Sequence, residues 1–384
     1  MTIVELAENV MNVVDFDPEF TNLSSGTYLV YHDQPLIAEY ISIDGTRRGN
    51  ILEYYPYYHD EIKMIQPEGR ELLLMNYEGS WQYTIRKIDL VDQTMRSWRV
   101  TFEDPDVLLC SEWINGRSSD SYCKDLVSFS PDGRWMVVDG RIHDRYGWYV
   151  IDFENGRAGY IYSTPWIYRY EGVPTYEQES PRHYTWSAGS NVLFRVLYDR
   201  QVDSIDWRYC MLVPAELRLV CGEMTEDKLF GVSPDGLRVV IWHLESGDGE
   251  GEITDTLIVG SPECILGLDL CQEDIVIRLP QRGSSISYWT ITVIADDDDY
   301  LIWAKYIVNQ QAEPGIVGRV NWETGESEIL FTNLPVGFSI FTLSPSGEWL
   351  GGTDNFGGSV LIRMDPGIIR RFEIGYFDGW LVIP

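Results

Sequence analysis

Short apolar runs, each preceded by a tight polar turn, recur along the whole chain. The clearest run covers residues 135–138 (Trp-Met-Val-Val) and follows Ser130, Pro131, Asp132 and Gly133. Proline presets φ, aspartate bonds its own backbone and glycine accepts a positive φ, so this quartet predicts a turn that leads into a strand. The same pattern recurs at 233–236 and 344–347, with weaker copies at 24–26, 66–69, 186–189 and 297–299. Seven turns predict seven repeats.

A second turn follows each of these turns at a nearly constant distance. These second turns lie at 44–45, 91–93, 154–156, 214–216, 261–263, 323–325 and 365–367, which is 19 to 26 residues after the first. Two hairpin turns in each repeat require four strands. Because 384 residues divided by seven is about 55, the period and the strand number together predict a β-propeller with four-stranded blades.

At this point the chain resembles the TolB-type and WD-repeat propellers. Blades of those families carry a Ser-Pro-Asp-Gly turn between the first two strands, as at residues 130–133, and an aspartate-to-glycine turn between the last two. The resemblance implies an all-β, single, seven-bladed propeller. It carries no functional assignment, because a propeller hosts many unrelated activities.

The repeat covers residues 18–384 without a linker, which predicts one domain. In the third blade we expect strands near 126–130, 135–139, 148–153 and 157–162, and we expect the C-terminal strand 379–383 to pair with the first blade and close the ring. Residues 1–17 are interpreted as an N-terminal helix and lead-in. Ile3, Leu6, Ala7, Val10, Met11 and Val14 have helical spacing, and Thr2 with Glu5 matches a capping box.

The two faces of such a ring differ in loop length. Short turns join the first to the second and the third to the fourth strands on one face. On the other face lie the long connections, at 104–124, 163–182, 198–208, 243–255 and 268–288. Long loops on a rigid scaffold commonly bind ligands. Their aromatic residues are the candidate binding residues, although packing against the blades is the alternative: Trp113, Trp166, Tyr168, Tyr170, Tyr176 and Trp207.

Polar residues also follow the inner strands, where they are expected to surround the axial mouth of the ring: His32, Asp33, Asn76, Asp139, His143, Asp199, His243 and Asp354. An ordinary solvated rim is the favoured interpretation of this set. No histidine pair or cysteine–histidine cluster has the spacing of a zinc site, and no Gly-x-Ser-x-Gly nucleophile motif is present. Asp248, Glu250 and Glu252 form a weak candidate for calcium, so no cofactor is expected beyond a divalent ion.

Charge and hydrophobicity narrow the range of partners. The formal net charge is −31, from 60 acidic and 29 basic residues, and this charge repels nucleic acid. No run of 18 apolar residues occurs, so no transmembrane segment is expected.

The six cysteines form three local pairs: Cys110 with Cys123, Cys210 with Cys221, and Cys264 with Cys271. Cys210 and Cys221 are centred on the turn at 214–217, so a hairpin places them opposite each other. Disulfides favour an extracytoplasmic location, whereas six reduced, buried thiols would indicate the cytoplasm. No signal peptide precedes Thr2, so secretion requires a mature or trimmed chain.

These observations favour a non-catalytic protein–protein interaction scaffold that binds its partner through the face with long loops. Two alternatives stay open. One is a lyase or glycoside-active enzyme with a divalent metal at the axial mouth, and the other is a carbohydrate-binding module that uses the loop tryptophans.

Overall fold

The computed structural model describes the strands and most of the short turns of the chain. The described residues are 3–7, 11–13, 19–21, 23–32, 39–54, 61–65, 69–79, 82–101, 127–142, 145–162, 184–187, 189–201, 204–225, 228–246, 253–266, 275–278, 289–296, 300–307, 315–321, 323–334, 338–354, 358–363, 367–372 and 376–384.

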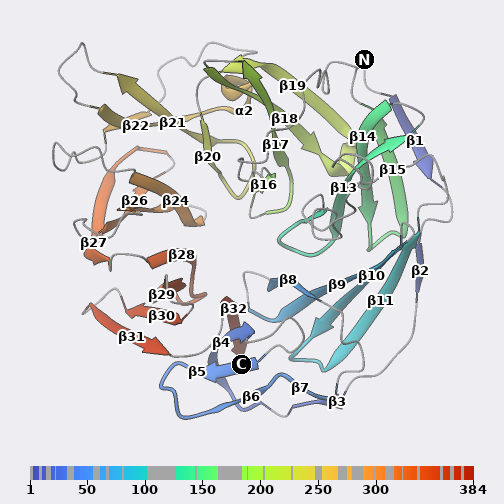
Figure 1. Ribbon diagram of the computed structural model, residues 1–384, viewed down its shortest axis with the longest axis vertical. Helices are drawn as coiled ribbons and strands as arrows, with labels where there is room; N and C mark the ends of the chain where they lie inside the picture. Colours follow the sequence, from blue (N-terminus) through green and yellow to red (C-terminus); the bar gives the residue numbers. More distant parts are fainter. Residues whose placement is uncertain are drawn as a thin grey trace.

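The described strands form antiparallel sheets arranged around a centre (Figure 1). Seven sheets contain four or five strands each, and the eighth is a single pair of strands. In each larger sheet the first strand lies nearest the centre of the ring and the fourth lies toward the outside. The fold is therefore an all-β propeller with mostly four-stranded antiparallel blades, as the turn pattern predicts.

We number the larger sheets in chain order. Sheet 1 contains β32 (Tyr376–Ile383), β4 (Gly26–His32), β5 (Glu39–Ser42) and β6 (Arg48–Asn50); sheet 2 contains β8 (Glu61–Ile65), β9 (Glu71–Gly79), β10 (Gln82–Asp89) and β11 (Thr94–Thr101); sheet 3 contains β12 (Val127–Phe129), β13 (Trp135–Ile142), β14 (Arg145–Asp152) and β15 (Arg157–Tyr162).

The remaining sheets continue around the ring. Sheet 4 contains β16 (Tyr184–Trp186), β17 (Leu193–Gln201), β18 (Ser204–Val213) and β19 (Arg218–Thr225); sheet 5 contains β20 (Lys228–Val232), β21 (Val239–Ser246), β22 (Ile253–Gly260) and β23 (Ile275–Arg278); sheet 6 contains β24 (Trp289–Asp296), β25 (Tyr300–Ile307), β26 (Gly315–Asn321) and β27 (Ser327–Leu334); sheet 7 contains β28 (Phe338–Leu343), β29 (Trp349–Asp354), β30 (Ser359–Arg363) and β31 (Ile368–Phe372). Two helical turns, η2 (Pro214–Glu216) and α2 (Pro262–Ile265), occupy third-to-fourth-strand connections, and β3 (Glu19–Phe20) pairs with β7 (Leu52–Tyr54).

The N-terminal segment differs from the expected helix. It contains two strands, β1 (Ile3–Ala7) and β2 (Met11–Val13). β1 pairs with β15 at the outer edge of sheet 3, and β2 pairs with β11 at the outer edge of sheet 2. An outer strand presents unpaired backbone N–H and C=O groups, and pairing with them outweighs a weak local helix propensity. The helix predicted within residues 1–17 is therefore wrong.

The C-terminal strand belongs to the first sheet. β32 is the innermost strand of sheet 1 and pairs antiparallel with β4, with Ile383 opposite Gly26 and Tyr376 opposite His32. Sheet 1 thus combines strands from both ends of the described chain. The Val382 backbone N–H also donates to the Gly69 carbonyl at 2.7 Å, which connects sheet 1 to sheet 2.

The turn glycines adopt the left-handed backbone that the sequence predicts at Gly133, Gly236 and Gly347. Sheet 4 is different, because Ser190 rather than Gly189 has the positive φ, at 61°. Gly189 instead donates its N–H to the Pro234 carbonyl at 3.0 Å. A Cβ on Gly189 would lie only 2.3 Å from that oxygen, so glycine is required there for close approach.

The core lies between neighbouring sheets. Sheets 2 and 3, for example, bury Met75 and Ile85 against Met136 and Ile151, and all four side chains are at most 2% exposed. Burial of a side chain of this size stabilises by about 1.5–3 kcal/mol. Equivalent clusters join the other neighbouring sheets for which clusters are described: 3 and 4, 4 and 5, 1 and 2, and 7 and 1. Among the described helices, none is long and apolar enough to cross a membrane.

Candidate functional site

The face that carries the short turns is built from a repeated serine–aspartate unit. We call it the turn face; it comprises the first-to-second and third-to-fourth strand turns. The buried Ser130 hydroxyl donates to Asp132 Oδ1 at 2.5 Å and accepts the Trp135 N–H at 2.8 Å. Ser233 makes the same contacts, at 2.6 Å to Asp235 and 2.9 Å from the Arg238 N–H. The hydroxyl thereby joins the two strands behind the turn.

Sheet 1 uses the same unit in its third-to-fourth-strand turn. The Ser42 hydroxyl donates to Asp44 Oδ1 at 2.6 Å and accepts the Arg47 N–H at 3.0 Å. The hydrogen bond from Ser42, followed by those from the Thr46 N–H and hydroxyl, lowers the pKa of Asp44 to about 2. Ser233 likewise lowers the pKa of Asp235. These turn carboxylates are therefore held in the ionised, accepting form.

An arginine binds the aspartate at the end of the third strand in two sheets. In sheet 3, Arg134 donates to Asp152 at 3.2 and 2.9 Å, and in sheet 2, Arg70 donates to Asp89 at 2.8 and 2.6 Å. Burial tends to raise the pKa of Asp152, but hydrogen bonds from Arg134 and Asn155 outweigh it and lower the pKa. These pairs were not predicted from the sequence. Their signal is an arginine directly after the turn glycine and an aspartate 18 or 19 residues later.

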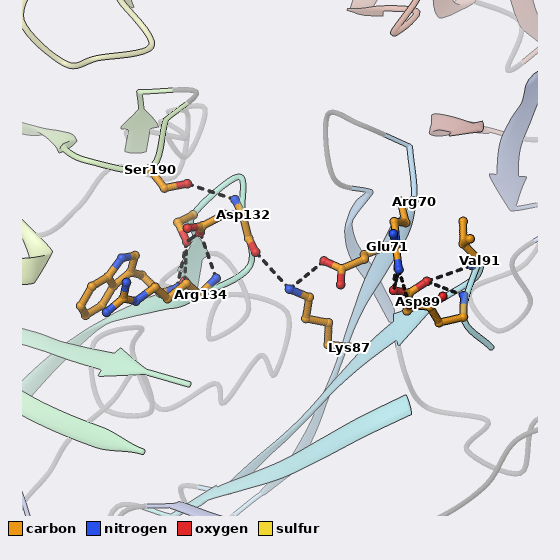
Figure 2. A network of polar contacts seen from close by, with 11 residues as sticks. Arg70, Glu71, Lys87, Asp89, Val91, Asp132, Arg134 and Ser190 are labelled. Carbon is orange, nitrogen blue, oxygen red and sulfur yellow. Dashed lines mark hydrogen bonds and ion pairs between the residues drawn. The ribbon is translucent and has the colours of Figure 1, made fainter. Parts of the chain in front are cut away.

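Polar contacts also connect the turn face from one sheet to the next (Figure 2). Lys87 Nζ of sheet 2 donates to the Asp132 carbonyl of sheet 3 at 3.2 Å. The Asp132 N–H in turn donates to the Ser190 hydroxyl of sheet 4 at 3.0 Å. With the Gly189–Pro234 contact between sheets 4 and 5, these bonds form a series along one face of the ring. Their donors and acceptors are engaged within the chain.

The expected axial-mouth residues lie mainly on equivalent strands. Six of the eight are on the second strand of their sheets: His32 in β4, Asn76 in β9, Asp139 in β13, Asp199 in β17, His243 in β21 and Asp354 in β29. Each of these strands runs away from the turn face. Asn76 is partly buried. Asp33 and His143 lie outside the described residues.

The expected binding loops are only partly described. The connections 104–124 and 163–182 lie outside the described residues, and with them Trp113, Trp166, Tyr168, Tyr170 and Tyr176. The predicted long loop 268–288 is wrong, because it contains β23, the fourth strand of sheet 5. The predicted long loop 198–208 is wrong, because β17 and β18 pair as far as Gln201 and Ser204. Trp207 therefore lies within β18, opposite Tyr198 and Thr225. The polar residues of this segment suggested a loop, but its aromatic and β-branched residues favour a strand, and the hairpin continues through it.

Metal candidates Asp248, Glu250 and Glu252 lie outside the described residues. In the part of the chain that the structure describes, no group of three or more His, Cys, Asp or Glu side chains is arranged to hold a metal ion.

The cysteine prediction is confirmed for one pair. Cys210 lies opposite Cys221 in the β18–β19 register, and the two form a disulfide with their Cα atoms 4.0 Å apart. Cys264 is disulfide-bonded as well. Its predicted partner Cys271 lies outside the described residues, as do Cys110 and Cys123. At least one local pair thus follows the predicted hairpin geometry.

Comparison with known proteins supports the fold. No family model matches the chain, and no curated protein matches its sequence. Among solved structures, the tricorn protease is similar over 97% of this chain, with 11% identity and a TM-score of 0.50. The chain spans 35% of the tricorn protease chain, about a third of its length.

Other similar structures belong to proteins with different roles. An oligogalacturonate lyase in complex with manganese covers 91% of this chain and is covered over 85% of its own, with 13% identity and a TM-score of 0.47. TolB from Acinetobacter baumannii covers 98% and is covered over 83%, with 13% identity and a TM-score of 0.37. At such identities the likeness concerns the β-propeller fold.

Proposed function

We propose that this protein is a non-catalytic propeller that binds another protein through the face opposite the turn face. The proposal rests on a difference between the two faces in how their polar residues are used. Serine hydroxyls, aspartates and arginines on the turn face are engaged with one another, as in the Arg134–Asp152 pair. The second strands that carry the polar candidate residues run toward the opposite face, and the sequence predicts that the long connections with their aromatic residues lie there.

Two further parts of the proposal concern the ring and its location. We infer seven blades, supported by the seven sheets of four or five strands and by the pairing of β32 with β4. We also infer an extracytoplasmic location, which the Cys210–Cys221 disulfide supports. Projection averages with another number of blades would contradict the first inference. Recovery of both thiols in alkylated form from freshly lysed cells would contradict the second.

The binding face is tested with matched variants on the two faces. W113A/W166A removes two tryptophans from the long connections, whereas L237A removes an exposed leucine, 69% accessible, from the turn face. Wild-type protein and L237A are expected to retain the same partner from a native extract, and W113A/W166A is expected to lose it. Equal retention by W113A/W166A, with an unchanged far-ultraviolet spectrum, would contradict the proposal.

A second candidate is an enzyme that uses a divalent ion at the axial mouth. It is favoured by one observation, the placement of six polar residues on equivalent second strands. Metal analysis of protein purified without chelator separates the two candidates. A stoichiometric divalent ion that is lost in an Asp139→Ala/His243→Ala variant would favour the enzyme, and its absence would favour the protein-binding role.

A further inference from the structure

At the end of its third strand, sheet 7 has an arginine where sheets 2 and 3 have an aspartate. In sheet 3 the last residue of the third strand is Asp152, which lies opposite Trp135 and binds Arg134. In sheet 7 the residue opposite the equivalent Trp349 is Arg363. An arginine therefore occupies the position at which the other two sheets place the carboxylate acceptor.

A second arginine lies beside Arg363. Arg363 is opposite Ile368 in the β30–β31 register, and Arg370 is two residues further along β31. The two arginines thus project from the same side of the sheet as diagonal neighbours, a placement in which Cβ atoms are about 7–8 Å apart. Both guanidinium groups lie against one ring, with Cζ at 5.8 Å (Arg363) and 5.6 Å (Arg370) from the centre of Trp349.

Neither arginine has a carboxylate partner among the described residues. Arg370 donates to the Ile43 carbonyl of sheet 1 at 2.7 Å, and the buried Nε of Arg363 has no hydrogen-bond acceptor there. A partly buried guanidinium without a counter-charge is unfavourable. The missing acceptor is notable in a chain whose net charge is −31.

Three other arginines of the described part of the chain lie over aromatic rings, and each has a carboxylate. Arg134 lies over Trp135 and binds Asp152, and Arg48 lies over Tyr31 and binds Glu39. Arg319 lies 4.5 Å from the centre of the Tyr300 ring and donates to Glu328 at 3.0 and 2.8 Å. Within the residues that the structure describes, the arrangement at Trp349 is the same unit without its carboxylate.

We propose that Arg363 and Arg370 form a carboxylate-binding site on the turn face, between sheets 7 and 1. The planar guanidinium of Arg363, held against Trp349, offers the fork of donors that a carboxylate accepts in bidentate fashion. Arg370 supplies the second positive charge. The ligand is a small dicarboxylate or an acidic segment of a partner, and the site is independent of the proposed partner face.

The test is isothermal titration of the full chain at constant ionic strength with malonate and, separately, a pentaglutamate peptide. Wild-type protein is expected to bind at least one of them saturably, and the tighter ligand identifies the source. R363Q and R370Q are each expected to weaken binding at least tenfold. R319Q, which removes a stacked arginine that already has its carboxylate, is the matched control and is expected to bind as wild type does.

Three further measurements keep the proposal falsifiable. R363K retains the charge but loses the forked donor geometry, so it is expected to lose part of the binding affinity. This variant replaces R363Q in the test if R363Q proves unstable. E348Q and D365N neutralise the acidic residues nearest in sequence to the two ends of the site, and both are expected to bind as tightly as wild type or more tightly. No saturable binding by wild type, equal binding by folded R363Q, or equally tight binding of sulfate would each overturn a carboxylate site.

Discussion

At the scale of single residues, left-handed backbone is not confined to glycine. Among the described residues, Gln93, Ser190 and Leu217 have positive φ values of 52°, 61° and 49°. A side chain in this conformation costs about 1–2 kcal/mol. Leu217 offsets this cost by packing against the sheet 3–sheet 4 core, where its Cδ1 lies 2.9 Å from the position that a Cβ on Gly159 would occupy. The exposed Gln93 has no comparable compensation.

Substitution by glycine is therefore expected to have opposite effects on the free energy of unfolding at Gln93 and at Leu217. Gln93→Gly relieves the strain and is expected to raise the free energy of unfolding by about 0.5–1 kcal/mol. Leu217→Gly also relieves strain but loses an apolar contact, so it is expected to lower that free energy by about 1–3 kcal/mol. Urea denaturation at equilibrium measures both. Stabilisation by Leu217→Gly would show that its packing contributes little.

The Arg134–Asp152 pair predicts a specific pH dependence. The pKa of Asp152 is lowered in the folded protein, so its contribution to stability is fully present above the pKa of the unfolded chain, about 3.9. That contribution is lost as the pH falls through the lower, folded value. Asp152→Asn is expected to cost about 1–2 kcal/mol at pH 7, and this difference from wild type is expected to shrink below about pH 4.

Glu154 provides the control for this measurement. It also contacts Arg134, at 3.1 Å, but its side chain is 66% exposed. Glu154→Gln is expected to change stability by less than about 0.5 kcal/mol at any pH. A pH-independent deficit in Asp152→Asn would assign its effect to packing rather than to charge.

At the scale of elements, turns were more predictable than strand ends. The turn at 130–133 is specified by local chemistry, because each of its residues has a conformational reason to be there. The strand β1 depends on the free edge of β15, a partner about 150 residues away that no local pattern reveals. The hairpin end near Trp207 depends on pairing in the same way. The sequence placed the axial-mouth residues after the inner strands, whereas six of them lie within second strands. The arginine–aspartate pairs have a sequence signal, but it becomes visible only once the paired strands are known.

The disulfide tests the element whose pairing the sequence did predict. Cys210 and Cys221 are 11 positions apart in sequence and join β18 to β19. Cys210→Ser/Cys221→Ser is expected to lower the free energy of unfolding by about 2–3 kcal/mol, mainly because the unfolded chain gains freedom. Denaturation of wild type with and without reductant gives the independent comparison. An unchanged midpoint in both experiments would contradict a stabilising role.

At the scale of the whole molecule, contact between sheet 1 and sheet 2 depends on the absence of a side chain. A Cβ on Gly69 would lie 2.9 Å from the Trp380 carbonyl oxygen and 3.0 Å from the Val382 nitrogen, both backbone atoms of β32. Gly347 has a similar positive φ, 72° against 69°, but nothing lies within 4 Å of its added Cβ. Substitution of Gly347 therefore measures the cost of backbone strain alone, whereas substitution of Gly69 measures the cost of strain together with contact against β32.

Gly347→Ala is expected to cost about 1 kcal/mol from the left-handed backbone alone. Gly69→Ala is expected to cost at least about 2 kcal/mol, because the added Cβ both strains the left-handed backbone and displaces β32. Hydrogen exchange should become faster at the β4 and β32 amides only in Gly69→Ala. Equal costs for the two substitutions would mean that β32 shifts without resistance.

The position of β32 also has a consequence for synthesis. Synthesis runs from the N-terminus, so β4 is made about 350 residues before its inner neighbour, residues 376–383. During that interval the growing polypeptide carries an unpaired strand edge, which invites capture by chaperones or by a neighbouring nascent chain. Synthesis that stops before residue 376 therefore leaves β4 without its inner partner.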